Sequence, residues 1–551
     1  MGFHASTDGS AKFYRVIVPL LVFVAFTTVF VTFRSNDIFT VDGAFRCFEV
    51  YRLHRFHFDI NNHLLYLLNV FAWTRFASWL GLSIETPLQF FSTVEIMNCL
   101  AGAGCLAIFC YLLFLITSSW RHALMGTIGF GLCRAFFAQA TNANQPMLGI
   151  FWSFLALYFA TFSLKRRSFW PSCVSGVLFA LAMATYQSTI LLAFAAIMLI
   201  FTSQSGDSSR FDFNRHQFFR FGVFSLSGIA TTITIFTWAY RNMDVSVPGE
   251  MVRRFFWHQE ARVYLKAGIG KTLNVPIGMV RNIFPILSSY NGLRGEMARR
   301  DLASLSSLIL VSAFCGFVLF CCVRIWKARA QLETSETIGL LSAAVGFAFT
   351  MIPVVLYDPM YDKLWIQPLA CLVVILVVAI RVIVRASNAS LWHLRAISIL
   401  LLSGVVLNLG WAVRVHLSKP YQLEEAQRLA RMLDREDLVV GNWDEVSVLY
   451  SSLLADEDRY FSFPTEAVIS GVETGTHLKG VISMTRERGG RVYFLGILDE
   501  RKDIWDSYLG TRCGVPYDTL KSYRENSRAR EVFRTRAGEV VLREFEPHDF
   551  N

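Results

Sequence analysis

Apolar runs that carry almost no charge recur along the chain, and most of them are about 18 residues long or longer. A helix of that length crosses the roughly 30 Å hydrocarbon core of a bilayer. The chain has 551 residues, 54% of them hydrophobic, and a mean hydropathy of +0.42, which is more apolar than a soluble protein of this size. The sequence therefore predicts an α-helical polytopic membrane protein with about 11 spans. The predicted spans are residues 16–33, 92–117, 123–139, 146–163, 171–185, 188–203, 221–240, 304–323, 338–357, 364–384 and 396–415.

The segment 63–82 decides the predicted topology, because it is apolar enough to span a bilayer and yet contains Arg75. If it spans, the basic residues at 165–167 and 210–220 fall outside the cell, against the preference of Lys and Arg for cytoplasmic loops. If it lies in the interface as an amphipathic helix, every basic cluster becomes cytoplasmic. We therefore predict an interfacial helix, a cytoplasmic N-terminus, and a first span that is retained because no small-residue cleavage site follows it.

This topology places two large loops and the C-terminal region on the extracytoplasmic side. The loops are residues 34–87 and 241–303, and residues 1–415 together form the predicted transmembrane domain. In residues 416–551 the charge rises, and short β-rich runs (DLVVGNW, GRVYFLGIL, EVVLREF) alternate with a helical pattern (YQLEEAQRLARML). That alternation predicts a soluble extracytoplasmic α/β domain.

Charge and cysteine content exclude several kinds of partner. The net charge of +10 does not indicate nucleic-acid binding, because much of it lies between apolar runs as cytoplasmic anchors. The 11 cysteines form no CxxC pair, and no dinucleotide-binding fingerprint is present, so we predict no cofactor. Compact loops without paired cysteines favour a bacterial inner membrane over the endoplasmic reticulum.

Asp42 is the candidate catalytic residue. It follows the first predicted span by a few residues, so its carboxylate is expected at the boundary between water and membrane. Low-dielectric surroundings make a carboxylate a stronger base, which suits it to accept a proton. The alternative is an ordinary solvated Asp in a loop.

The same loop contains a group of His, Asp and Asn residues with two interpretations. His54, His57, Asp59 and His63 offer the nitrogen and oxygen atoms that bind divalent metals. Their spacing matches no compact metal motif, so we predict no metal ion. We interpret these residues, together with Asn62, as the lining of a polar substrate pocket.

Cationic side chains on the predicted outer face can meet the phosphate of an anionic lipid. Arg46 lies in the first loop, and Arg253 and His258 lie in a basic, aromatic-rich part of the second loop that suits such a head group. The alternative for the second loop is general anchoring to an anionic membrane surface. In the run YDPMYDKLWIQPL, Lys363 lies just before a span and beside Asp362, which indicates a polar site at the membrane boundary.

The order of these elements resembles a known family. After the first helix come VDGAFR with its acidic residue, the interfacial segment NNHLLYLLNVFAW, the short loop TNANQPMLGIFW and the hairpin GVLFALAMATYQS. In this order the chain is similar to the GT-C superfamily of integral-membrane glycosyltransferases, and most similar to its branch of protein O-mannosyltransferases and lipid A aminoarabinose transferases. The resemblance extends to about residue 200 and, more loosely, to residues 357–365 and the C-terminal domain.

The resemblance implies an activity and roles for particular residues. It implies an inverting transfer of a sugar from a polyprenyl-phosphate donor, at the outer face of the membrane, to a lipid, glycan or protein acceptor. Asp42 would take the proton of the acceptor hydroxyl, and Arg46 and Lys363 would stabilise the charge of the leaving lipid phosphate. Relatives carry an acid and a Lys where this chain has Gln145 and Tyr186, and we place both residues in the substrate site.

Two other classes of function stay open. A transporter or flippase of lipid-linked glycans would carry ionisable residues in the middle of its helices, whereas the predicted spans are almost free of charge at their centres. A non-catalytic membrane scaffold is the other alternative, because the acid and the Lys of the family are replaced. An Asp42→Asn change without effect would favour the scaffold.

Overall fold

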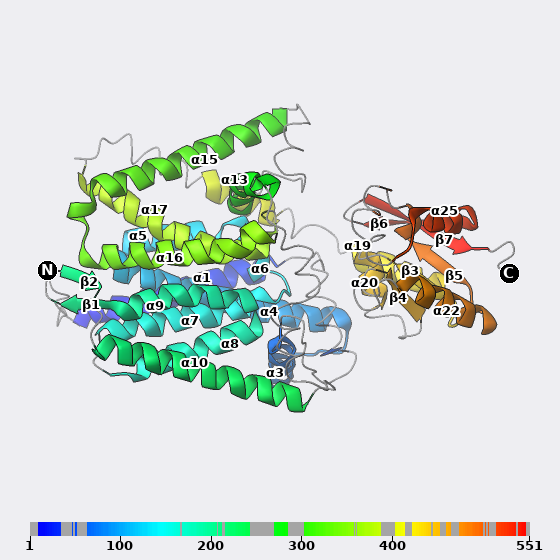
Figure 1. The fold of residues 1–551 in the computed structure, drawn as a ribbon, viewed down its shortest axis with the longest axis horizontal. Coiled ribbons are helices and arrows are strands. Elements are labelled where there is room, and N and C mark those ends of the chain that lie inside the picture. Colours follow the sequence, from blue (N-terminus) through cyan, green and yellow to red (C-terminus); the bar gives the residue numbers. More distant parts are fainter. Residues whose placement is uncertain are drawn as a thin grey trace. The chain divides into compact units, whose positions relative to one another are not determined.

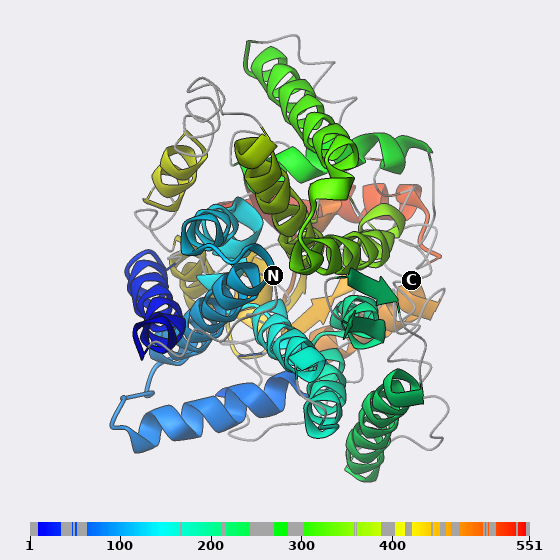
Figure 2. The same cartoon turned by 90° about the vertical axis from the view of Figure 1, so that its left-hand side faces the viewer.

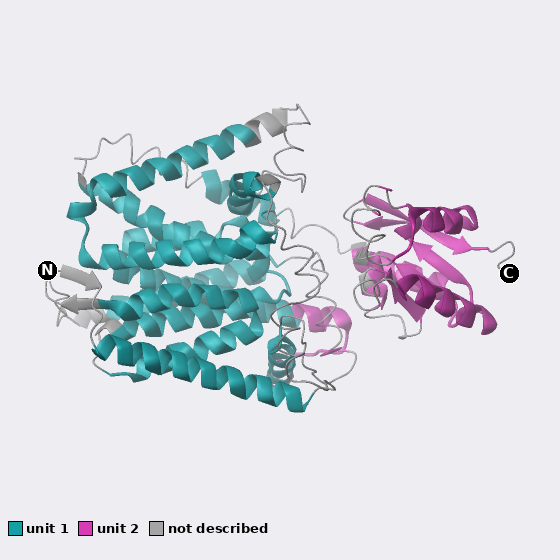
Figure 3. Ribbon diagram, viewed as in Figure 1, with its two compact units in different colours: residues 1–35, 57–76, 93–416 teal, residues 36–56, 77–92, 417–551 magenta. Residues whose placement is uncertain are grey.

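The computed structural model contains two compact units (Figure 3). One comprises residues 1–35, 57–76 and 93–416, and the other comprises residues 36–56, 77–92 and 417–551. The structure describes residues 9–34, 47, 50–51, 63–165, 168–205, 208–211, 215–242, 269–284, 302–357, 359, 361–386, 403–413, 421–441, 445–451, 459–463, 473–499, 502, 505, 514–535 and 538–546.

The first unit is a bundle of apolar helices, most of which run side by side (Figure 1). Among the described residues, seven helices are long and apolar enough to cross a membrane: α1 (Gly9–Thr32), α4 (Pro87–Thr117), α7 (Pro146–Lys165), α10 (Arg215–Arg241), α15 (Leu302–Lys327), α16 (Thr334–Leu356) and α17 (Ile366–Ala386). Three shorter apolar stretches also lie where spans are predicted: α8 (Trp170–Thr185), η1 with α9 (Gln187–Leu192, Ala193–Phe201) and the helix Ser403–Val413. The predicted α-helical, multi-pass fold is confirmed, and the count of about 11 spans stays a prediction.

One predicted span is broken. Residues 123–139 are expected as one helix, but α5 (Trp120–Gly131) and α6 (Arg134–Ala140) meet at an angle of 70°. Gly131 lies at the break, where an added Cβ would come within 2.5 Å of the Leu106 side chain and 2.8 Å of Phe26. The bend therefore lets the chain pack closely against its neighbours and turns α6 away from the direction of α5.

The doubtful segment 63–82 forms a short helix, α3 (Tyr66–Trp79). Its 14 residues fall below the roughly 20 needed to cross a bilayer. It lies across the direction of the spans (Figure 2), and Phe76 and Trp79 are exposed. These features agree with a helix that lies in the membrane interface, where Trp is enriched.

The two ends of the bundle differ. One end, here called the α3 end, holds α3, α6 and α13 (Ile269–Ile283) (Figure 1). The other, here called the hairpin end, holds the antiparallel strands β1 (Thr202–Ser205) and β2 (Ser208–Phe211), which the sequence did not indicate. The first turn of α16 and the last turns of α17 also lie there, joined by ion pairs that Arg381 and Arg385 make with Glu333 and Glu336.

The C-terminal region of the second unit is an α/β domain. Its five-stranded sheet has the order β4-β3-β5-β7-β6. Strands β4, β3 and β5 run parallel, and β7 runs antiparallel to both of its neighbours, β5 and β6. The elements are α19 (Tyr421–Met432), β3 (Leu438–Gly441), α20 (Glu445–Leu449), β4 (Tyr460–Ser462), α22 (Thr474–Glu487), β5 (Val492–Leu495), η7 (Ile497–Asp499), α25 (Tyr517–Glu525), β6 (Ser527–Thr535) and β7 (Gly538–Phe545). The three β-rich runs and the helical pattern of the sequence are thus confirmed as β3, β5, β7 and α19.

Two contacts hold this domain together. Trp505 is fully buried in the core, and its indole donates a hydrogen bond to the Val515 carbonyl at 2.9 Å. Asp437, just before β3, accepts hydrogen bonds from the backbone N–H and the guanidinium of Arg491, just before β5, both at 2.9 Å. The hydrogen bond to Asp437 raises the pKa of Arg491. These hydrogen bonds tie the start of β3 to the start of the neighbouring strand β5.

Candidate functional site

Two predicted site residues stack on each other at the α3 end. The rings of His63 and Tyr186 are 5.7 Å apart between centroids and are inclined by only 10°. Both side chains are buried. Tyr186 follows the end of α8, and the nearby Leu65 N–H donates to the Ala184 carbonyl at 2.9 Å, which holds the segment that begins at His63 against this turn.

The loop between α6 and α7 is held by amide side chains. Asn98 of α4 donates to the backbone carbonyls of Asn142 and Asn144, both at 2.7 Å. The Asn144 side chain donates to Gln139 at 2.5 Å and accepts from the backbone N–H of Gln145 at 2.8 Å. Gln145, a predicted site residue, is therefore fully buried in a fixed loop rather than in a mobile one.

A close helix contact brings Gln145 and Tyr186 into one region. Gly149, in the first turn of α7, lies against Tyr186, where an added Cβ would come within 2.7 Å of the Tyr186 Cβ. Only a glycine allows this approach without a shift of one helix. The structure thus brings together His63, Tyr186 and the start of α7, which follows Gln145 directly.

Lys363 and Asp362 occupy a short 3₁₀ turn, η3 (Asp362–Leu364), just before α17. The Asp362 carboxylate accepts the backbone N–H of Lys363 at 2.8 Å, and the Lys363 ammonium lies 4.6 Å from the centroid of the Tyr361 ring. Both side chains are partly exposed. A cation held over an aromatic face in this way is positioned rather than freely solvated.

The surroundings of η3 fix it in place. Trp365 is fully buried and donates its indole N–H to the Pro359 carbonyl at 2.7 Å. Lys271 of α13 donates to the carbonyls of Leu356 and Tyr357 at 3.0 and 2.7 Å, and so binds the end of α16. η3 also contacts α6, which carries the Gln139 that binds the 140–145 loop. α6 therefore lies between the Lys363 region and the Gln145 region.

Glu95 is a buried acid that the sequence interpretation missed. It lies eight residues into α4, its side chain is buried, and one of its carboxylate oxygens has no hydrogen-bond partner among the described residues. Arg34, just past the end of α1, is near enough for its charge to act on this carboxylate. The sequence alone could have identified Glu95, because an ionisable residue within an apolar run is by default a candidate functional residue. Glu95 lies near the start of the predicted span 92–117, so it does not change the expectation that the spans are almost free of charge at their centres.

All the remaining predicted site residues lie outside the described part of the chain. They are Asp42, Arg46, His54, His57, Asp59, Asn62, Arg253 and His258. Of the predicted site, the structure thus describes His63, Gln145, Tyr186, Asp362 and Lys363. His63 and Tyr186 stack beside the start of α3, and η3, which holds Asp362 and Lys363, contacts α6. Among the described residues, no group of three or more His, Cys, Asp or Glu side chains could hold a metal ion.

Comparison with known proteins gives matches in structure alone. No family model matches the sequence, and no curated protein matches it. The crystal structure of ArnT from Cupriavidus metallidurans bound to undecaprenyl phosphate superimposes with a TM-score of 0.55 at 12% identity, over 97% of this chain and 98% of ArnT. The apo oligosaccharyltransferase of Archaeoglobus fulgidus gives 0.53 at 11% identity, over 95% of this chain and 74% of its own.

A second crystal structure of that oligosaccharyltransferase, in complex with Zn and sulfate, gives a TM-score of 0.52 at 10% identity, over 95% of this chain and 72% of that one. At these identities the likeness concerns the fold. It includes both the helical bundle and the C-terminal domain, because the match with ArnT runs over almost the whole of both chains. The chain therefore has the fold of the GT-C glycosyltransferases, as the order of its sequence elements predicted.

Proposed function

We propose that this protein is an inverting glycosyltransferase that moves a sugar from a polyprenyl-phosphate donor to a lipid, glycan or protein acceptor at the outer face of the membrane. One observation carries the proposal: the fold of ArnT, a protein crystallised with undecaprenyl phosphate, extends over 97% of this chain. The polar residues at the α3 end support it, because a donor with a lipid tail presents its phosphate and sugar at the membrane boundary.

The proposed reaction is a single displacement. Asp42 accepts the proton of the acceptor hydroxyl while that oxygen forms a bond to the anomeric carbon of the sugar. The bond between the anomeric carbon and the phosphate oxygen breaks, and polyprenyl phosphate leaves. Attack and departure on opposite faces invert the anomeric configuration. A positioned general base contributes about 10²–10⁴-fold to such a rate.

Cations at the α3 end stabilise the leaving phosphate in this proposal. Lys363 lies among the described residues, and Tyr361 and the turn at Asp362 fix its position. Arg46, Arg253 and His258 are the other proposed phosphate ligands. A cation that is held in place before the reaction stabilises the developing charge without a further cost of reorganisation.

His63, Tyr186 and Gln145 form the proposed floor of the sugar site, and His54, His57, Asp59 and Asn62 belong to the same pocket. A stacked His–Tyr pair offers a flat surface and polar ring atoms, and Gln145 offers an amide. Such groups suit hydroxyl-rich ligands and need no nucleotide-binding loop, because the lipid carries the activated sugar. We also propose that the protein lies in a bacterial inner membrane, where lipids surround it. We propose no nucleic-acid partner.

The proposal is tested by sugar transfer in membranes from cells that lack the native gene. Labelled polyprenyl-phosphate sugars are supplied to wild type, Asp42→Asn and Asp37→Asn at equal protein levels. Asp37 is the matched control, because it is an acid in the same loop, five residues earlier. We expect wild type and Asp37→Asn to transfer label, and Asp42→Asn to lose about two decades of rate.

Three results would contradict the proposal in different ways. Equal rates for wild type and Asp42→Asn would remove Asp42 as the base. Equal losses for Asp42→Asn and Asp37→Asn would indicate a general effect of loop charge. A folded wild-type protein that transfers no sugar but moves intact lipid-linked glycans across vesicles would favour the flippase.

A further inference from the structure

One face of α13 contacts the chain just before the turn that carries Lys363. Lys271 and Gly278 lie seven residues apart in α13, which is about two helical turns, so both positions share a face. Lys271 contacts the end of α16, and Gly278 contacts Pro359, which lies between α16 and η3. Ile277 of the same helix is buried in the core of the bundle. The α13 helix is therefore anchored in the bundle and can hold this part of the chain in place.

The contact at Gly278 is too close for any side chain. An added Cβ would collide with the Pro359 carbonyl oxygen and would lie 3.3 Å from the Trp365 ring. The same carbonyl accepts the indole N–H of Trp365 at 2.7 Å, and both Pro359 and Trp365 are buried. A side chain at position 278 would therefore have to displace the backbone at Pro359, because no flexible side chain is there to move aside.

A chain of contacts leads from Lys271 to Lys363. The Lys271 ammonium donates to the Tyr357 carbonyl at 2.7 Å. The ring of Tyr357 lies 5.9 Å from the ring of Tyr361 between centroids, and the Lys363 ammonium lies 4.6 Å from the centroid of the Tyr361 ring. A displacement of Tyr357 would thus move the aromatic face on which the Lys363 cation rests.

We propose that Gly278 and Lys271 are positioning residues, which hold the Lys363 ammonium where the leaving lipid phosphate develops its charge. The inference rests on the proposed function, in which Lys363 stabilises that phosphate. A cation stabilises a developing charge best when its position is set before the reaction. Lysine depends on such support, because its four-carbon stem is flexible. A misplacement of about 1 Å can lower a rate by about 10²-fold.

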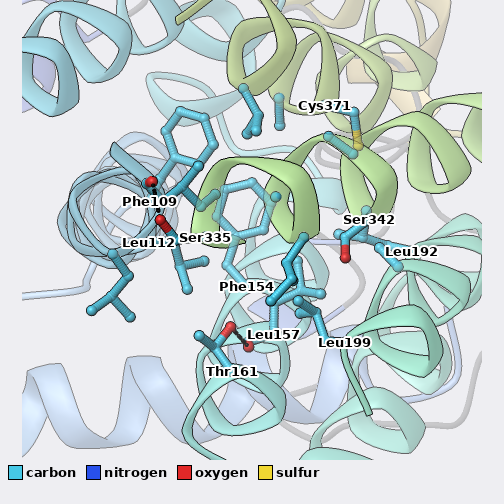
Figure 4. Close-up of a pocket in the computed structure, with 18 residues that line it drawn as sticks. Phe109, Leu112, Phe154, Leu157, Thr161, Leu192, Leu199, Ser335, Ser342 and Cys371 are labelled. Carbon is cyan, nitrogen blue, oxygen red and sulfur yellow. Dashed lines mark hydrogen bonds between the residues drawn. The ribbon is translucent and has the colours of Figure 1, made fainter. Parts of the chain in front are cut away.

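The proposed positioning residues are separate from the apolar cavity inside the helical bundle (Figure 4). Helices α4, α7, α16 and α17 and the η1–α9 segment line this cavity, which has a volume of about 110 Å³ and reaches Ser335 in the first turn of α16. None of its described lining residues belongs to α13 or η3. A substitution in α13 or at Lys363 therefore leaves the lining of the cavity unchanged.

The test is a double-mutant cycle in the full-length protein in lipid vesicles. Its variants are Gly278→Ala, Lys363→Met and the two combined, and Gly316→Ala is the matched control. Gly316 lies in α15, and an added Cβ there would meet nothing within 4 Å. Two quantities are measured for each variant. One is kcat for transfer from labelled polyprenyl-phosphate sugars, and the other is the affinity for undecaprenyl phosphate, which carries no sugar.

We expect Gly278→Ala to lower kcat by about 10- to 100-fold and Gly316→Ala to match wild type. In the Lys363→Met background, Gly278→Ala should lower kcat by less than about twofold, because no ammonium is left to misplace. The affinity for undecaprenyl phosphate should show the same dependence on Lys363. A purely structural role of Gly278 would instead give two independent losses that multiply in the combined variant.

The possible failures are distinct. Losses that multiply in the combined variant, or a Gly278→Ala protein as active as Gly316→Ala, would overturn the positioning role and leave the proposed function intact. A Lys363→Met change without effect would overturn the positioning role and remove Lys363 from the phosphate site. A folded wild type that transfers no sugar would contradict the proposed function, and the affinity cycle then decides the positioning role. A wild type that also binds no undecaprenyl phosphate would contradict both.

A second variant covers the case in which Gly278→Ala does not fold. Lys271→Met then takes its place in the cycle, because it removes the hydrogen bond to the Tyr357 carbonyl without adding a side chain at the close contact. Its loss should also disappear in the Lys363→Met background. An undiminished loss in that background would overturn the proposal.

Discussion

A single amide, that of Asn98, fixes much of the backbone around the candidate site. Its side chain is fully buried, and both of its hydrogen bonds go to carbonyls of the 140–145 loop. A carbonyl left unpaired in such surroundings costs about 1–3 kcal/mol, because neither water nor another donor replaces the lost bond. Asn98 therefore contributes, with the hydrogen bonds of Asn144, to the conformation of the loop that holds Gln145.

We predict that Asn98→Ala lowers the free energy of unfolding by about 1–3 kcal/mol. The measurement is denaturant-induced unfolding of the purified protein in detergent. Asn242→Ala is the matched control, because the Asn242 amide also donates to a backbone carbonyl, that of Trp238, but in an exposed position. Its effect should stay within about 0.5 kcal/mol. Equal effects of the two substitutions would show that Asn98 does not hold the loop.

At the scale of residues, sequence reasoning found part of the site and missed the rest for a physical reason. His63 was identified from the polar residues of its loop, and Gln145 and Tyr186 were identified from a resemblance. The structure places Tyr186 against His63 and against the start of α7. Asn98 was not identified, because a lone Asn in an apolar run does not reveal which distant carbonyls it binds. Glu95 was identifiable, since a charge in a span is unusual wherever it lies.

Length and hydropathy predicted most helices of the bundle, because apolar length alone decides whether a segment can cross a bilayer. The break between α5 and α6 and the β1–β2 hairpin were not predicted. Gly126, Gly129 and Gly131 lower the helix propensity of the segment before the break. Whether the helix breaks there depends on the side chains of other helices that pack against these glycines. In the C-terminal domain, β6 (Ser527–Thr535) was missed because charged residues occupy much of this edge strand.

The packing of α8 against α10 depends on Gly176. An added Cβ there would come within 2.2 Å of the Phe224 carbonyl oxygen, and Ser227 donates to the Cys173 carbonyl across the same contact at 3.0 Å. Small residues allow membrane helices to approach closely in this way. We predict that Gly176→Ala lowers the free energy of unfolding by about 1–3 kcal/mol, because the helices must separate.

Gly222→Ala is the control for this contact. Gly222 lies in α10, the other helix of this contact, but an added Cβ there would meet nothing within 4 Å. Denaturant-induced unfolding in detergent should show no loss of stability for Gly222→Ala. If Gly176→Ala proved as harmless as Gly222→Ala, close packing at Gly176 would not contribute to the stability of the bundle.

On the scale of the whole molecule, the proposed reaction requires one orientation of the helical bundle in the membrane. The α3 end must face outward if a lipid-linked donor is used at the outer leaflet. The predicted interfacial position of α3 would determine this orientation, since one additional span would reverse every later loop. We predict that a reporter fused after Lys165 is cytoplasmic and that one fused after His416 is extracytoplasmic. An external signal after Lys165 would show that residues 63–82 cross the membrane.

The most direct test of the proposed reaction is the anomeric configuration of its product. Purified wild-type protein in lipid vesicles is supplied with labelled polyprenyl-phosphate sugars of known configuration and with a membrane extract as acceptor. The products are then followed by mass spectrometry and NMR. We predict the release of free polyprenyl phosphate in proportion to transferred sugar, with the anomeric configuration inverted. Transfer with retained configuration, or a lipid-linked sugar that stays intact, would contradict single-displacement glycosyl transfer by this protein.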